Sequence, residues 1–140
     1  MTVSENVYQA PESDVANIST ETTTMSRKDI LFSFQGRIPR KTYWLSVLGL
    51  MLISVLAMLV LSGIGAMISQ NAAIFLPLLI YIPLIWSSLA IQVKRWHDRN
   101  KSGWWVLIGL VPVIGGIWVL IENGFLAGDE AENRFGKPTV

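Results

Sequence analysis

Three long stretches of the chain carry no charged residue, and they constrain the fold more than any other feature. They cover residues 44–68, 72–93 and 104–121. At about 1.5 Å per residue each can cross roughly 30 Å of hydrocarbon, the third only just. Because lipid offers the backbone no hydrogen-bond partner, such stretches must be helical. We therefore predict an all-α fold, an integral membrane bundle of three transmembrane helices.

Composition supports a membrane protein and narrows the chemistry. Hydrophobic residues make up 51% of the chain and charged residues 15%, a balance unlike that of ordinary soluble domains. The chain has no cysteine and one histidine, His97. This excludes disulfides, thiolate nucleophiles and cysteine-based metal sites. No metal and no cofactor is predicted.

Prolines and glycines interrupt two of the predicted spans. Pro77 and Pro83 should kink the second, while Pro112 and the pair Gly115-Gly116 weaken the third. We expect the third span to be kinked at Pro112 but complete. The alternative is a re-entrant segment, broken at Pro112 or at the glycine pair, that returns the C-terminal tail to the side from which it came.

The N-terminal region differs from the rest of the chain. Residues 1–26 are rich in serine, threonine and acids and are predicted to be a disordered tail, whereas residues 27–138 form a single membrane domain. Ser26 and Asp29 fit a capping box, and Ile30, Leu31 and Phe34 follow at helical spacing. A short interfacial helix is predicted here.

The distribution of Lys and Arg predicts the orientation. Residues 27–43 hold five, the loop 94–103 holds four, the turn at 69–71 holds none and the tail after Glu122 holds two. By the positive-inside rule the N-terminus and the loop are cytoplasmic, and with three crossings the C-terminus is periplasmic. Five tryptophans lie near the predicted cytoplasmic ends of the spans, where an amphipathic ring is well accommodated.

Three motifs flank the predicted spans. They read FQGRIPRKTYW (residues 34–44), RWHDRNKSGWW (residues 95–105) and ENRFGKP (residues 132–138). In this order they resemble the small bacterial inner-membrane family catalogued as domain of unknown function 805 (DUF805), over roughly residues 30–138. The resemblance implies a bacterial inner-membrane location and no established activity.

The basic and aromatic residues of the first two motifs are candidates for binding anionic lipid headgroups or a membrane partner. Guanidinium groups can hold phosphate bidentately, and about 1 kcal/mol per juxtamembrane cation would make a strong lipid signal. The alternative is that these charges only fix the topology. The candidate residues are Arg37, Arg40, Lys41, Arg95, Arg99, Trp104 and Trp105.

Four further polar residues are candidates for a structural cluster: His97, Asp98, Asn133 and Arg134. Asp98 is expected to pair with an arginine, and His97 to bond backbone at a tight turn. If the third span crosses completely, Asn133, Arg134 and Phe135 are periplasmic and unable to touch His97. No catalytic residue is assigned, because Ser102 is a nucleophile by residue type only.

We predict a non-enzymatic inner-membrane protein whose cytoplasmic face engages anionic lipids or a membrane partner. The runner-up is a small transporter or channel formed by a homo-oligomer, although no charge lies within any predicted span. An intramembrane enzyme using His97 and Asp98 ranks third. A nucleic-acid partner is not expected, because a loop of about ten residues between two spans offers too little surface for a groove.

Overall fold

The structure, a computed structural model, describes residues 24–139. Within this part the chain is helical, and its one β contact is an isolated bridge between Asn133 and Gly136. The all-α prediction is confirmed. The predicted disordered tail lies outside the described residues except for residues 24–26.

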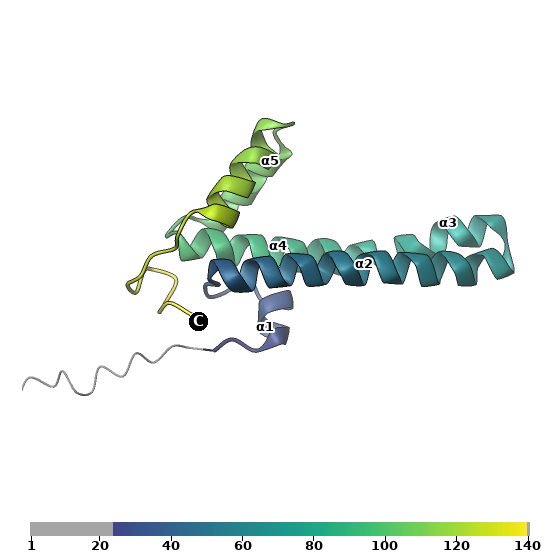
Figure 1. The fold of residues 1–140 in the computed structure, drawn as a ribbon, viewed down its shortest axis with the longest axis horizontal. Coiled ribbons are helices and arrows are strands. Elements are labelled where there is room, and N and C mark those ends of the chain that lie inside the picture. Colours follow the sequence, from purple (N-terminus) through teal and green to yellow (C-terminus); the bar gives the residue numbers. More distant parts are fainter. Residues whose placement is uncertain (1–23, 140) are drawn as a thin grey trace, which may run out of the picture.

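Two antiparallel helical arms form the body of the molecule (Figure 1). One arm is α2 (Arg40–Ile68), and the other consists of α3 (Gln70–Leu78) followed by α4 (Tyr81–Asp98). Ser69 forms the turn between them, and its hydroxyl accepts a hydrogen bond from Ala72 N at 3.1 Å. Each arm, Arg40–Ile68 and Gln70–Asp98, is long and apolar enough to cross a membrane.

The second arm is interrupted where its prolines predict. Leu79 and Ile80 lie between α3 and α4, and their N–H groups bond carbonyls three residues earlier, at Leu76 and Pro77. Pro83 has no N–H to donate and its ring would clash with the carbonyl four residues before it, that of Leu79. The helix therefore tightens for one turn and then continues.

A short helix, α1 (Arg27–Phe32), precedes the first arm and lies against α4. Ser26 caps it by accepting from Lys28 N at 3.3 Å, as the sequence predicts for this position. Lys94 binds it from the other end, donating to the carbonyl oxygens of Asp29 and Ser33. The Lys94 amine thus supplies a donor to carbonyl groups that have no partner within the short helix α1.

The third apolar stretch does not form one continuous helix, so that part of the prediction was wrong. It is an apolar hairpin made of η2 (Gly103–Leu110), a turn, α5 (Ile114–Val119) and η3 (Leu120–Phe125). Pro112 forces Val111 into an extended conformation and so ends η2. At Gly115 a Cβ atom would overlap the carbonyl oxygen of Ile108, and the absence of one lets the two halves pack together.

The turn of the apolar hairpin is a strained γ-turn. Val113 has φ 64° and ψ −63°, and Ile114 N bonds Pro112 O at 2.7 Å across it. This is the rare form of the γ-turn, and it is unfavourable for a β-branched residue. Each half of the hairpin is about 16–18 Å long, too short to cross the hydrocarbon core.

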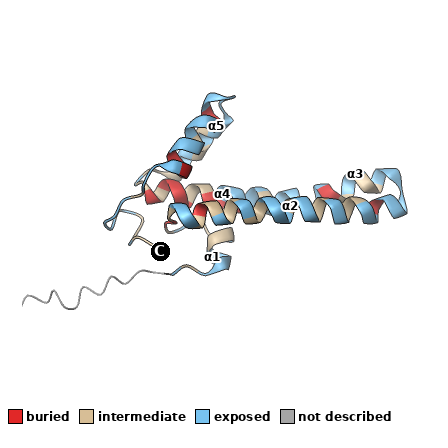
Figure 2. Cartoon of the chain, viewed as in Figure 1, coloured by how far each residue is buried: buried red, intermediate tan, exposed pale blue. Residues whose placement is uncertain are grey.

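Because the hairpin folds back, the C-terminal tail lies beside the loop that follows α4. The ring of Phe135 stacks on His97 at 3.8 Å, and Asn133 bonds the carbonyl of His97. The prediction that the tail is separated from His97 by a third crossing was therefore wrong. Buried residues gather where α4 ends, α2 begins and the hairpin returns (Figure 2).

Candidate functional site

The three motifs meet at one end of the helical arms in what we call the polar cap, residues 34–41, 94–102 and 122–139. Its centre is Asp98, at the end of α4, with a side chain that is 8% exposed. Its carboxylate accepts from Arg37 Nε at 3.1 Å and from Arg95, one turn earlier on α4. Both arginines are fully buried. The pairing expected for Asp98 is present, with two partners.

The charges of these arginines are shared between Asp98 and the backbone of the tail. Arg37 also donates to the carbonyl oxygens of Asp129, Ala131 and Gly136, and Arg95 donates to those of Asn123 and Leu126. Buried cations need such acceptors, because an unpaired charge away from water is strongly unfavourable.

Three more side chains bind the same stretch of backbone. Arg40 donates to Phe125 O at 2.8 Å, Trp44 to Gly124 O at 3.1 Å, and Arg99 to Ala127 O at 2.8 Å. Several of these carbonyls are at or just beyond the end of η3, where the helix itself supplies no donor. The first two motifs therefore hold the tail chiefly through its main chain.

The return of the hairpin is held by Glu122, the first charged residue after the third apolar stretch. Its carboxylate lies 2.7 Å from Arg99 and 2.8 Å from Lys101. Burial favours the neutral acid, but these two cations outweigh it and the pKa of Glu122 is lowered. The amine of Lys101 also lies over the rings of Trp96 and Trp105, 5.5 and 5.1 Å from their centroids.

His97 and Asp98 bond to different partners. His97 Nδ1 lies 3.2 Å from Gly36 O and donates to it, while the Asp98 carboxylate is occupied by arginines. The Ser102 hydroxyl caps η2 by accepting from Trp104 N. No group of three or more potential metal ligands occurs among the described residues. The arrangement is one of structural hydrogen bonds and ion pairs.

The residues proposed from the sequence for lipid binding fall into two groups. Arg37 and Arg95 are fully buried, and Arg99 is paired with Glu122, so these three are turned inward. The others are exposed, Trp104 to 78% and Trp105 to 43%: Arg40, Lys41, Trp104 and Trp105. Lipid binding by any of them remains a prediction.

Sequence reasoning missed three features of the cap. Gly128 lies so close to Asp98 that a Cβ atom would overlap the carboxylate. Glu122 could have been found as the acid that ends an apolar stretch opposite a basic loop. Asn123 is fully buried with no side-chain partner among the described residues, and no pattern in the sequence indicates this.

A groove runs between α1 and α2, just outside the polar cap. It has a volume of about 420 Å³, and Arg27 stands among its otherwise uncharged lining. Arg27 makes no ion pair with any residue that the structure describes. The lining residues are Arg27, Ile30, Leu31, Thr42, Leu45, Ser46, Gly49, Leu50 and Ile53.

These features define an all-α membrane protein with two candidate spans, an apolar hairpin and a polar cap. The chain belongs to the family described as "Protein of unknown function (DUF805)", whose model matches residues 31–137. This confirms the resemblance seen in the three motifs.

Curated relatives match most of the chain. It is 32% identical over 139 residues to the uncharacterized protein YiiR of Escherichia coli, covering 82% of this chain and 91% of that protein. The inner membrane protein YhaH of the same organism is 33% identical over 110 residues, covering 74% and 84%. The inner membrane protein YhaI is 30% identical over 104 residues, covering 74% and 82%. No solved structure gives a significant match.

Proposed function

We propose that this protein resides in the bacterial inner membrane with its polar cap on the cytoplasmic side and binds anionic phospholipid there. The observation that carries the proposal is the groove between α1 and α2, in which one cation, Arg27, stands beside an apolar channel. A phospholipid is complementary to this groove, because its anionic phosphate can pair with the cation and its acyl chains can lie along the apolar channel.

The sidedness rests on where the cations lie. All eleven Lys and Arg residues belong to α1, the segment between α1 and α2, the first turn of α2, the end of α4, the following loop or the tail. The turn at Ser69, at the far end of the two arms, has none. With two crossings the positive-inside rule is therefore satisfied more fully than with three, and it favours a cytoplasmic cap. Two relatives carry the words "inner membrane protein" in their names.

The attraction to lipid comes from four exposed cations that we call the cationic rim: Arg27, Lys28, Arg40 and Lys41. At about 1 kcal/mol per juxtamembrane cation, the rim contributes about 4 kcal/mol of attraction to an anionic leaflet. The buried arginines of the cap add little, because their donors are already used. The rim sets the charge preference and the groove accommodates one acyl chain.

Native mass spectrometry of the full-length protein with phosphatidylglycerol tests the proposal. Gly49 lines the groove, and a Cβ atom there meets nothing within 4 Å. Gly49→Leu should fill the groove and Arg27→Gln should remove its charge, each lowering retention of phosphatidylglycerol. Gly63→Leu is the matched control, since Gly63 is equally open on the same helix but does not line the groove.

Retention of phosphatidylethanolamine, which has no net charge, should be weaker in the wild type and insensitive to Arg27→Gln. If Arg27→Gln and Gly49→Leu retain phosphatidylglycerol as well as Gly63→Leu does, the proposal is wrong and the rim serves only to fix topology.

A further inference from the structure

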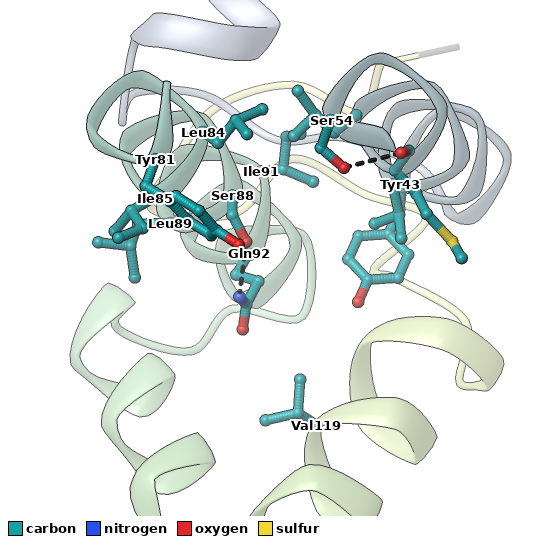
Figure 3. A pocket seen from close by; sticks show the side chains of 13 residues that line it. Tyr43, Ser54, Tyr81, Leu84, Ile85, Ser88, Leu89, Ile91, Gln92 and Val119 are labelled. Carbon is teal, nitrogen blue, oxygen red and sulfur yellow. Dashed lines mark hydrogen bonds between the residues drawn. The ribbon is translucent and has the colours of Figure 1, made fainter. Parts of the chain in front are cut away.

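A second cavity lies on another side of α2, between the two arms and the apolar hairpin (Figure 3). It has a volume of about 490 Å³, within the range of small-molecule sites, and its lining shares only Leu50 with the groove. No charged side chain lines it. Most of its wall is apolar, contributed by α2, α4 and Val119 of α5.

Two polar residues of the cavity have hydrogen-bonding groups without partners among the described residues. Tyr43 is 7% exposed, and its hydroxyl makes no hydrogen bond with any described residue. The amide nitrogen of Gln92 reaches only Ser88 Oγ, at 3.4 Å, and its carbonyl oxygen accepts nothing from the described residues. Figure 3 shows both side chains extending toward the gap opposite Val119. Buried away from water, such unpaired groups are unfavourable.

The two ends of the cavity differ in their polar groups. Tyr43 and Gln92 are at the end near the polar cap, while Ser54 and Tyr81 are eleven residues away along their antiparallel helices. Eleven residues of helix correspond to about 16 Å. At the end far from the cap both hydroxyls already donate hydrogen bonds, Ser54 to Met51 O and Tyr81 to Met58 Sδ. The free donor and the free acceptor are together at the cap end only.

We infer that this cavity binds a neutral lipid with a long apolar chain and a hydroxyl or carbonyl group at one end. The apolar chain fits the channel beside α5, and the polar end bonds Tyr43 and Gln92. A fatty acid anion or a phospholipid headgroup is disfavoured, because no cation lines the cavity and burying an unpaired charge is strongly unfavourable.

The probe for this site is a long-chain fatty alcohol carrying a diazirine on its chain, photolysed with the full-length protein in nanodiscs. Labelled peptides should map to the cavity wall on α2, α4 and α5. The double variant Tyr43→Phe with Gln92→Leu keeps the shape of the wall but removes its free polar groups. Labelling should fall about three- to tenfold per lost hydrogen bond. Gln70→Leu, on α3 outside the cavity, is the matched control and should label as the wild type does.

The diazirine analogues of the corresponding fatty acid and alkane should label the cavity weakly and respond little to the double variant. The thermal unfolding midpoint of Tyr43→Phe should be no lower than that of the wild type, because the hydroxyl has no partner to lose and its burial is unfavourable. Equal alcohol labelling in the double variant and in Gln70→Leu would overturn the inference. So would disulfide formation between two Ser88→Cys chains, which would place a second copy of this cysteine-free protein in the cavity.

Discussion

Gly128 of the C-terminal tail packs directly onto the carboxylate of Asp98, with no space between them for a side chain. The next residue of the tail also contacts Asp98, because Asp129 N donates a hydrogen bond to Asp98 O at 2.8 Å. The tail thus closes over the acid that balances two buried arginines. Stability of the polar cap and attachment of the tail should therefore change together.

Replacing Gly128 by alanine should destabilise the cap. The added Cβ atom overlaps the Asp98 carboxylate, so either the tail or the ion pairs must move, at a cost of about 2–4 kcal/mol. Thermal unfolding in detergent measures this. Gly116→Ala is the control, because a Cβ there meets nothing within 4 Å. Equal unfolding midpoints for the two variants would contradict the close packing.

Asp98→Asn should release the tail. Without the carboxylate, Arg37 and Arg95 are buried with carbonyl acceptors only, and breaking a buried ion pair in this way typically costs about 3–5 kcal/mol. Limited proteolysis should cut the variant between residues 126 and 136 much faster than the wild type. Glu130→Gln, at an exposed position of the same tail, should be cut at the wild-type rate.

Labelling of single introduced cysteines can determine on which side of the membrane the tail lies, since the chain has no cysteine of its own. We expect Glu130→Cys in the tail and Thr24→Cys before α1 to be protected from an impermeant thiol reagent in intact spheroplasts. Asn71→Cys, at the far turn, should be labelled. All three positions are exposed. Labelling of Glu130→Cys but not Thr24→Cys would restore the three-crossing topology.

Val113→Gly should stabilise the apolar hairpin. Glycine adopts φ 64° without strain, and relieving such strain yields about 1–3 kcal/mol, less about 0.5–1 kcal/mol for the added freedom of the unfolded chain. The thermal unfolding midpoint should rise. Val111→Gly, where φ is −74°, should lower it. A fall in both variants would mean that the Val113 side chain matters more than its backbone.

Acid should weaken the return of the hairpin through Glu122. Because its pKa in the folded protein is lowered from 4.5, its contribution to stability is fully present above pH 4.5. It is lost as the pH falls through the lowered value. Between about pH 5 and pH 3 the thermal unfolding midpoint should therefore fall less in Glu122→Gln than in the wild type. Glu132→Gln, at an exposed position, should keep the wild-type pH dependence.

Much of this architecture follows from local rules. Uncharged stretches of sufficient length specify the two helical arms, Ser26 begins α1, and the prolines of the second stretch predict its interruption before Pro83. The three motifs are sufficient to recognise the family. Each of these inferences depends on residues that are neighbours along the chain, where spacing and hydrogen-bonding rules apply directly.

The third stretch shows where such rules end. Its length and composition permit a crossing, and Pro112 permits either a kink or a break. The break is decided by Gly115, which allows η2 and α5 to pack closely, and by the acceptors that the returning chain presents to the cap. Those acceptors are backbone carbonyls from Asn123 to Gly136, which every sequence possesses, so no residue pattern could reveal that Arg37 and Arg95 would bind them. The two helical arms and the distribution of charged residues follow from local properties of the chain, so they could be predicted from the sequence alone. The burial of the arginines and the return of the tail to His97 depend on contacts between segments far apart along the chain, so they become visible only in the folded protein.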